Sequence, residues 1–308
     1  MDRLEWCREN CPKLWRDLPD DELISKMTDA WEIAQLDNKT ESEEPMEEHS
    51  LNIVNNHLDY MVIELTKEFG NKLAFKGGYM LTKLMNNRAR QTSDIDFSIL
   101  TADIYNAIKT KLVDVCDHLI SVGAIDSYKI KDNIQPNMSG GADMYKDGKK
   151  ILGVDVGWHD ITYGTCIRNL DVGELNSFEI ERMLADKITA ILSRKRFRRP
   201  KDLYDLYCIS ECMEFNAKKI SDYIIKRTNG IGADWANLPF TADVLREYEK
   251  AYNSLRLESV YKDVELVRPK FSVVIDRFEC IANKVKNPEG NVYWSLKKEC
   301  FVKEDGKI

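Results

Sequence analysis

Two aspartates, Asp94 and Asp96, flank a single apolar residue, Ile95, in the segment Ser-Asp-Ile-Asp-Phe. In a β-strand, residues two positions apart point to the same face, so the two carboxylates would stand side by side. Carboxylates this close repel each other unless a cation lies between them. Ligands made of oxygen alone suit Mg²⁺ or Mn²⁺, which share the rest of their coordination with substrate phosphates. The pair therefore predicts a metal-dependent nucleotidyl transfer site.

A third acid is expected, because nucleotidyl transfer commonly uses a further carboxylate on a neighbouring strand to hold the metal ions. Asp155 is the best candidate, since it lies between two valines in the segment Gly-Val-Asp-Val-Gly, where alternation would bury it unless it binds something. Asp160 is the weaker alternative because it follows the strand in a polar turn. We predict that Asp94, Asp96 and Asp155 are the metal ligands.

A glycine pair precedes these acids in the chain. Gly77 and Gly78 remove side chains where a triphosphate would approach the backbone, and the helix that follows offers free N–H groups to anions. Lys76 and Arg90 supply positive charge for the phosphates, and Ser93 directly precedes the acid pair. We predict that these five residues bind the nucleotide.

The competing interpretation of these segments is a turn followed by two solvent-facing aspartates on an edge strand. Apolar residues at positions Phe75, Ile95, Phe97 and Ile99 disfavour it, because they indicate a strand in the core of a sheet.

The elements that must position these residues follow from helical and extended hydrophobic patterns. The predicted helices cover residues 1–36, 50–69, 79–85, 101–122, 178–193 and 201–215, and the predicted strands cover residues 73–76, 93–100, 124–131, 142–145 and 150–156. We expect an α+β protein with a small mixed β-sheet of nucleotidyltransferase type and flanking helices. The expected divisions are an N-terminal helical extension (1–49), the nucleotidyltransferase core (50–165) and a mainly helical C-terminal domain that contributes to the site (166–308).

The composition is that of a globular protein, with 43% hydrophobic and 31% charged residues. No apolar run is long enough to cross a bilayer, so we expect no membrane partner. The eight cysteines are scattered without a disulfide-rich pattern, which favours reduced thiols and a cytoplasmic location. The net charge of −7 excludes a surface that binds nucleic acid everywhere.

Two separate motifs resemble those of the AbiEii/AbiGii toxin family, whose members are nucleotidyltransferase-like proteins of toxin–antitoxin and phage-abortive-infection systems. The first motif comprises Phe75-Lys-Gly-Gly-Tyr-Met-Leu and Arg90-Gln-Thr-Ser-Asp-Ile-Asp-Phe. The second comprises Glu181-Arg-Met-Leu-Ala-Asp-Lys-Ile-Thr-Ala and Arg199-Pro-Lys-Asp-Leu-Tyr-Asp-Leu. Together they span roughly residues 73–210, in the order that the family shows.

The resemblance implies roles for two residues of the second motif. Lys187 would reach the triphosphate, and Asp202 would complete the polar site from the next helix; Asp205 is a second choice. Lys201 stands where the family usually has arginine, which keeps the charge but loses the bidentate fork. From the residues alone, Lys187 could equally be a lysine at the border of its helix, and Asp202 could be the N-cap of the helix that follows.

The resemblance also implies an activity. An NTP would supply a nucleoside monophosphate in the presence of Mg²⁺ or Mn²⁺, a tRNA 3′ end would accept it, and a cognate antitoxin would come from a neighbouring gene. The protein would then act as a growth-arresting toxin or a phage-defence effector. Three alternatives stay open: a catalytically silent nucleotide-binding module, nucleotidylation of a protein, and nucleotidylation of a small molecule.

Overall fold

The computed structural model describes residues 4, 8, 19–20, 23–24, 48–85, 88–131, 139–158, 163–193, 199–228, 230–258 and 266–303. The chain divides into two compact units, Met1–Ser50 and Leu51–Ile308. Most of the predicted N-terminal helical extension, and the alternative acid Asp160, lie outside the described residues. The second unit, which the helix α3 (Glu48–Phe69) leads into, contains all the predicted site residues that the structure describes.

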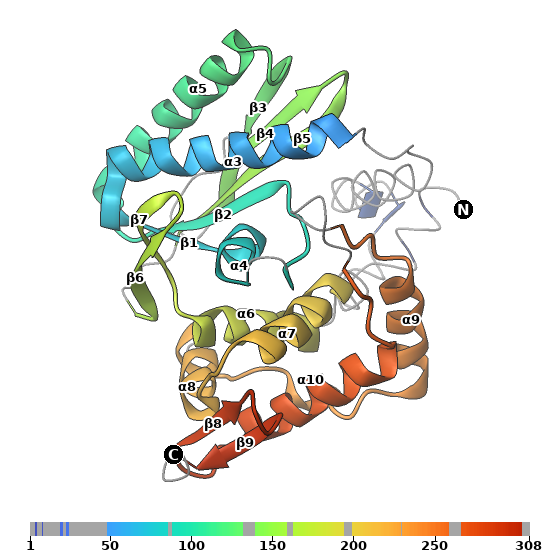
Figure 1. The fold of residues 1–308 in the computed structure, drawn as a ribbon. Coiled ribbons are helices and arrows are strands. Elements are labelled where there is room, and N and C mark those ends of the chain that lie inside the picture. Colours follow the sequence, from blue (N-terminus) through green and yellow to red (C-terminus); the bar gives the residue numbers. More distant parts are fainter. Residues whose placement is uncertain are drawn as a thin grey trace. The chain divides into compact units, whose positions relative to one another are not determined.

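A mixed β-sheet forms the centre of this unit (Figure 1). In the described part of the chain it has seven strands in the order β3-β4-β5-β2-β1-β7-β6. Strand β2 runs parallel to β5 and β1 runs parallel to β7, whereas the other neighbours are antiparallel. The strands are β1 (Leu73–Lys76), β2 (Asp94–Ile99), β3 (Ser127–Lys131), β4 (Ser139–Lys146), β5 (Lys149–Trp158), β6 (Thr165–Leu170) and β7 (Gly173–Phe178). The expected mixed sheet with flanking helices is confirmed.

Alternation along the strands separates the sheet into an apolar face and a polar face. On β2, Ile95 and Phe97 are fully buried, and in the register of the parallel pair their partners on β5 are Val154 and Val156, which are buried as well. Asp94 and Asp96 alternate with these residues and therefore belong to the opposite, polar face. The buried side chains fix the orientation of the strand, because a slip of one residue would exchange the two faces.

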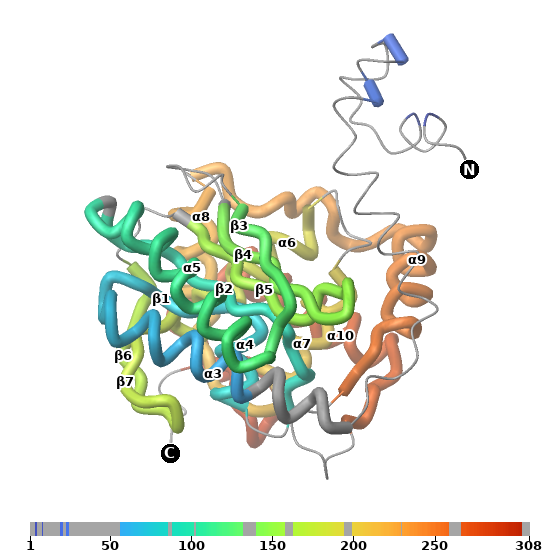
Figure 2. The backbone as a smooth tube through the Cα atoms, turned by 90° about the horizontal axis from the view of Figure 1, so that it is seen from above, coloured from blue at the N-terminus to red at the C-terminus, as the bar shows by residue number. Residues whose placement is uncertain are grey.

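Helices α3 and α5 (Tyr105–Ser121) cover the apolar face. The Tyr128 hydroxyl of β3 donates a hydrogen bond of 2.8 Å to Asp117 of α5, and Tyr128 is in register with the buried Met144 of β4. Lys111 of α5 forms an ion pair of 3.1 Å with Glu64 of α3, which places the two helices beside each other. Seen from above in Figure 2, α3 and α5 lie near each other.

The short helix α4 (Gly77–Met85) begins directly after β1. Its Tyr79 hydroxyl donates to Asp59 of α3 at 2.7 Å, and Lys83 forms an ion pair of 2.9 Å with the same carboxylate. These contacts tie α4 to α3. The glycine turn and the helix expected after it are therefore confirmed, with the helix starting at the first glycine.

The C-terminal part of the unit is mainly helical. It contains α6 (Ile180–Leu192), α7 (Pro200–Cys212), α8 (Ala217–Arg227), α9 (Ala242–Asn253), α10 (Phe271–Lys286) and a hairpin of β8 (Val292–Ser295) and β9 (Cys300–Lys303). The hairpin is anchored by Trp294, which is fully buried, stacks on Phe215 with ring centroids 5.8 Å apart, and donates its indole N–H to the Ser210 carbonyl at 2.7 Å.

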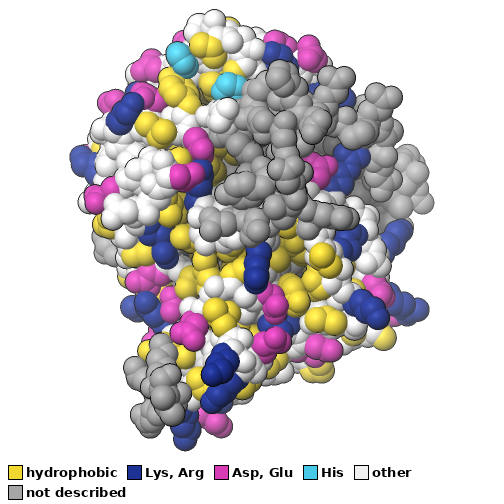
Figure 3. Space-filling model, viewed as in Figure 1, with side chains coloured by type: hydrophobic (Ala, Val, Ile, Leu, Met, Phe, Trp, Pro, Cys, Tyr) yellow, Lys and Arg dark blue, Asp and Glu magenta, His cyan; other side chains and the backbone are white. Residues whose placement is uncertain are grey.

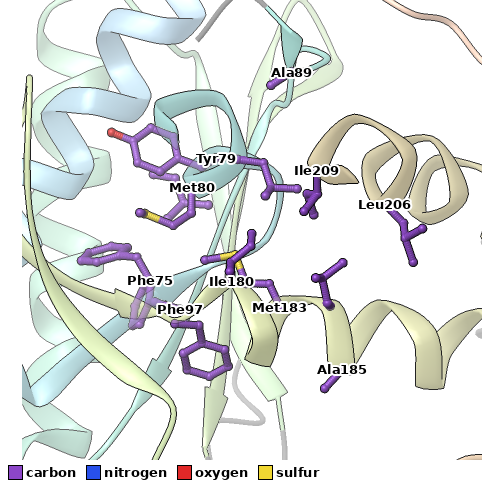
Figure 4. Close-up of a cluster of buried hydrophobic side chains, with 14 of the residues drawn as sticks. Phe75, Tyr79, Met80, Ala89, Phe97, Ile180, Met183, Ala185, Leu206 and Ile209 are labelled. Atoms are coloured by element: carbon purple, nitrogen blue, oxygen red, sulfur yellow. The ribbon is translucent and has the colours of Figure 1, made fainter. Parts of the chain in front are cut away.

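A continuous hydrophobic core joins the sheet to these helices. Figure 4 shows part of it, drawn from the sheet, α4, α6, α7 and the segment before β2. Its labelled members are Phe75, Tyr79, Met80, Ala89, Phe97, Ile180, Met183, Ala185, Leu206 and Ile209. Because the core is shared, the sheet holds α6 and α7 in place.

The sheet extends past residue 165, where the sequence predicted the core to end. Strands β6 and β7 form a hairpin with Asp171 and Val172 at its turn, and Ser177 of β7 lies beside Phe75 of β1 in a parallel pair. The sequence prediction missed this hairpin because its segment, Thr-Cys-Ile-Arg-Asn-Leu-Asp-Val-Gly-Glu-Leu-Asn-Ser-Phe, lacks a regular alternation. Within the described residues, no helix combines the length and the apolar character that crossing a bilayer requires.

Candidate active site

The three predicted metal ligands lie on two adjacent strands. In the parallel pair of β2 and β5, Asp96 is in register with Asp155, and Asp94 is in register with Gly153. Residues in register on neighbouring strands share a face, so the three carboxylates belong to the same polar face of the sheet. Asp94 and Asp96 are half-buried, whereas Asp155 is exposed. The expectation that alternation would bury Asp155 is wrong, because alternation along β5 buries the flanking Val154 and Val156 and turns Asp155 to the polar face. The fold thus brings together acids that are about 60 residues apart in the chain.

The glycine turn lies directly against this acid cluster. Gly77 has a φ of +72°, and a Cβ atom at this position would lie 2.1 Å from Asp96 Oδ2. A Cβ on Gly78 would lie 3.0 Å from the hydroxyl oxygen of Thr92, the residue two positions before β2. Only glycine satisfies both the backbone angle and the close approach at position 77. The first N–H groups of α4, which lack partners inside their own helix, are therefore close to the Asp96 carboxylate.

Burial changes the ionisation of Asp96. It raises the pKa of this carboxyl to about 6, and the negative charges of Asp155 and Asp94 act in the same direction against the opposing field of Lys76. Within the described residues, no side chain forms an ion pair or a hydrogen bond with the Asp96 carboxylate. A bound cation would favour its charged form, so this donor set fits a divalent metal ion by its chemistry. No group of three or more histidine, cysteine or acidic side chains in the described ranges converges into a preassembled metal site.

The remaining residues of the first predicted set differ in their surroundings. Lys76 on β1 is in register with Asp96, and its ammonium lies over the Phe178 ring, 5.4 Å from the centroid. Ser93 is exposed, and its carbonyl accepts a hydrogen bond of 2.9 Å from the Gly153 amide. Ser93 therefore helps to join β2 to β5, whereas Lys76 places a positive charge beside the acids.

Arg90, Lys187 and Asp202 meet in a buried ion-pair network that Asp205 completes. The Lys187 ammonium contacts Asp205 at 2.7 Å and Asp202 at 3.0 Å. The Arg90 guanidinium contacts both oxygens of Asp205, at 2.9 Å through Nε and at 3.1 Å through a terminal nitrogen. Asp205, which the sequence ranked behind Asp202, is thus the acid that both cations share.

Two alternatives from the sequence are wrong. Lys187 does not extend from the border of its helix to solvent, because it is 8% exposed and bound by two carboxylates. Asp202 is not an N-cap, because α7 begins at Pro200 with Arg199 at the N-cap position, which leaves Asp202 in the first turn.

The network is charged. Burial by itself lowers the pKa of Lys187, but the carboxylates of Asp205 and Asp202 outweigh it and raise the pKa above its ordinary value. Burial raises the pKa of Asp205, yet Lys187 and Arg90 together hold it below its ordinary value. The loop before β2 and the helices α6 and α7 are therefore joined by buried charges.

The family of the protein can be assigned from its sequence. Residues 64–270 match the model of a family described as "Nucleotidyl transferase AbiEii toxin, Type IV TA system". This chain belongs to the AbiEii family. The matched range includes the acid cluster, the glycine turn and the buried network, so the resemblance noted in the sequence is confirmed. As a member of this family, the protein is a nucleotidyl transferase toxin.

Solved structures with a related arrangement are distant from this AbiEii protein. MenT4, a nucleotidyltransferase toxin from Mycobacterium tuberculosis H37Rv, is 16% identical with a TM-score of 0.48, over 78% of this chain and 85% of that chain. A putative nucleotidyltransferase from H. pylori is 16% identical with a TM-score of 0.42, over 79% and 99% of the respective chains. A c-di-GMP synthase from Capnocytophaga granulosa is 14% identical with a TM-score of 0.25, over 77% and 82%. Among curated protein sequences, none matches this chain.

Three further residues border the acids of this AbiEii protein and were missed in the sequence. Asp143 of β4 is in register with Gly153 of β5, which in turn is in register with Asp94. Lys131 of β3 and Lys150 of β5 both form ion pairs with Asp143. One signal was present, because Asp143 lies between the buried Ala142 and Met144 and alternation places it on the polar face.

Charges of both signs surround these elements. On the face shown in Figure 3, basic and acidic side chains are interspersed over the described residues. This distribution agrees with the net charge of −7, which is small for 308 residues. The electrostatic potential near the site is therefore determined by local pairs of opposite charges and not by a surface of one charge sign.

Proposed function

We propose that this AbiEii protein transfers a nucleoside monophosphate from an NTP to a hydroxyl acceptor, and that Asp94, Asp96 and Asp155 hold Mg²⁺ or Mn²⁺. The observation that carries the proposal is the register of Asp96 with Asp155 on parallel strands, with the Asp96 carboxylate against Gly77 and without a side-chain partner among the described residues. Buried carboxylates without partners are costly, and a divalent cation offsets that cost.

The reaction is an in-line displacement at the α-phosphorus. The acceptor oxygen forms a new bond to this phosphorus, the bond to the oxygen that bridges the α- and β-phosphates breaks, and pyrophosphate leaves while the hydroxyl proton passes to solvent or a nearby base. The metal would supply charge neutralisation on the phosphates when bound. In the chain itself, the glycine turn admits the triphosphate close to the backbone, and Lys76 adds positive charge beside the acids.

The buried network is proposed to bind and orient the nucleotide from the helical side. The Lys187 ammonium has three N–H donors, and two carboxylates contact it, so it retains a donor for a phosphate oxygen. Arg90 directs Nε and one terminal nitrogen to Asp205, which fixes the plane of its guanidinium. Fixed donors lose little entropy when a substrate binds, and this favours a role in positioning.

The acceptor is proposed to be an RNA 3′ end, with tRNA as the first choice because the family resemblance implies it. A protein hydroxyl is the second choice. Toxin activity of this type requires a cognate antitoxin, which we propose is encoded by a neighbouring gene, and growth arrest or phage defence would be the outcome in the cell.

The test incubates the purified full-length chain with each of the four α-labelled NTPs, Mg²⁺, and either total RNA or an RNA-free protein extract. We expect label in RNA, its loss with a chelator, and its recovery with Mn²⁺. The variant Asp94→Asn/Asp96→Asn should abolish labelling, whereas Asp114→Asn, an exposed acid on α5, should leave it unchanged. Label in protein would show that the acceptor is a protein and not RNA. The absence of label with every NTP in both fractions would refute the transfer activity.

A further inference from the structure

Two lysines border the acids that are proposed to bind metal, and each lysine contacts one of them. The Lys150 ammonium lies 3.3 Å from Asp94 Oδ1, and the Lys131 ammonium lies 3.0 Å from Asp155 Oδ1. Both ammonium groups also contact a single oxygen, Asp143 Oδ1, at 2.9 Å from Lys150 and 3.0 Å from Lys131. A chain of ion pairs therefore runs from Asp94 to Asp155 through Asp143.

The backbone creates the space for this arrangement. Gly153 lies between Asp143 and Asp94 on adjacent strands, in register with both. A Cβ atom on Gly153 would lie 2.1 Å from Asp94 Oδ1 and 2.9 Å from the Lys150 ammonium. The absence of a side chain at Gly153 thus leaves room for the Asp94 carboxylate and the Lys150 ammonium to approach each other. A side chain at this position would push the two groups apart.

Asp143, Lys150 and Lys131, which link the two proposed metal ligands, favour their charged forms. Burial lowers the pKa of Lys150, but the carboxylates of Asp94 and Asp143 outweigh it and raise the pKa; the same holds for Lys131 beside Asp155 and Asp143. Burial raises the pKa of Asp143, yet the adjacent ammonium groups of Lys150 and Lys131 bring it below its ordinary value. Asp143 and the two lysines therefore keep their charges near neutral pH.

We propose that Asp143 is a positioning residue for the metal-binding carboxylates and acts through the two lysines. Asp143 holds Lys150 and Lys131 at a distance where each contacts the Oδ1 atom of its partner acid, so that the second carboxylate oxygen of Asp94 and of Asp155 would be left to hold a cation. This inference rests on the proposed function, because it assumes that these acids bind metal. Groups behind a metal ligand commonly orient it in this way.

The arrangement predicts how the loss of the Asp143 charge changes metal binding. Without the Asp143 charge, the lysines lose their shared anchor and are attracted fully to Asp94 and Asp155, where they compete with the metal ion. Removal of Asp143 should therefore weaken metal binding. If both lysines are absent, the same removal should have little effect, because nothing is left for Asp143 to hold.

The experiment is a double-mutant comparison with Mn²⁺ alone as the probe and its affinity for the full-length protein, measured by electron paramagnetic resonance, as the readout. Asp143→Asn is isosteric, and we expect it to weaken Mn²⁺ binding on the order of tenfold in the natural background. In the Lys131→Met/Lys150→Met background the loss should fall below about twofold. Lys149→Met, at the next position of the same strand, and Asp114→Asn are the matched controls, and thermal unfolding of every variant verifies the fold.

An equal loss in both backgrounds would overturn the inference, since Asp143 would then act as a metal ligand or through its bulk charge. No loss in the natural background would overturn it too. If Asp143→Asn does not fold, Asp143→Glu, which keeps the charge but moves it, should show the same dependence on the lysines. The proposed function fails separately: in that case the natural protein would bind no Mn²⁺, or Asp94→Asn/Asp96→Asn would bind it unchanged.

Discussion

Replacement of Asp205 by asparagine should destabilise the fold more than the loss of any surface ion pair. The carboxylate receives two contacts from Arg90 and one from Lys187, between 2.7 and 3.1 Å, and its side chain is 4% exposed. Contacts to charged groups contribute about 1.5–3 kcal/mol each, but Lys187 keeps Asp202, and the new amide keeps one acceptor oxygen. Breaking a buried pair by removing one partner costs about 3–5 kcal/mol, so we expect a loss of about 3 kcal/mol.

The assay is urea unfolding followed by tryptophan fluorescence, with Asp222→Asn as the control. Asp222 contacts Lys218 at the same 2.7 Å distance that joins Asp205 to Lys187, but both side chains of the control pair are about half exposed. An exposed pair of this kind contributes less than about 1 kcal/mol. Because the two ion pairs have the same contact distance, a difference between their losses of unfolding free energy reflects burial.

The contribution of Asp205 to the unfolding free energy should fall at low pH. The pKa of Asp205 is lower in the folded protein than its ordinary value of 3.8, because Lys187 and Arg90 outweigh its burial. The stabilisation is complete at pH values above the unfolded pKa and is lost as the pH falls through the folded value. The difference in unfolding free energy between the natural protein and Asp205→Asn should thus be constant from pH 7 to pH 5 and shrink below pH 4.

Two results would refute this reasoning. One is a loss below about 1 kcal/mol, which would make the buried network no stronger than a surface pair. The other is an equal loss for Asp205→Asn in the Lys187→Met background, because a shared ion pair requires the two changes to couple by roughly 1–3 kcal/mol.

Two further predictions concern the glycine turn and the C-terminal hairpin. Gly77→Ala should abolish nucleotide transfer and destabilise the fold by more than about 2 kcal/mol, because it adds a contact with Asp96 to the cost of a positive φ; Gly123→Ala, with a φ of +70° and no atom near its Cβ, should cost only about 1 kcal/mol. Equal losses of unfolding free energy in the two variants would show that the fold relieves the contact with Asp96 at no cost. Trp294→Ala should lower the unfolding free energy by about 3–5 kcal/mol through the loss of its burial and its stacking on Phe215, and an unchanged urea midpoint would contradict that anchoring role.

The sequence predicted the local elements of the site well, because their signals are local. A glycine pair between a strand and a helix, and an Asp-Ile-Asp alternation, are determined by backbone angles and by the period of a strand. The flanking valines likewise pointed to Asp155, since alternation along one strand shows which residues share a face. The strand β2 and the helices α4 to α7 are therefore close to their predicted bounds.

Contacts between distant segments were decided only by the tertiary structure. Whether Asp96 meets Asp155 depends on the register of β2 against β5, and Asp143 reaches the same face only because β4 pairs on the far side of β5. Register is fixed by the packing of buried side chains from many elements, so no single segment encodes it. For the same reason the choice of Asp205 as the shared acid of Arg90 and Lys187, and the addition of β6 and β7 to the sheet, could not be derived from the chain alone.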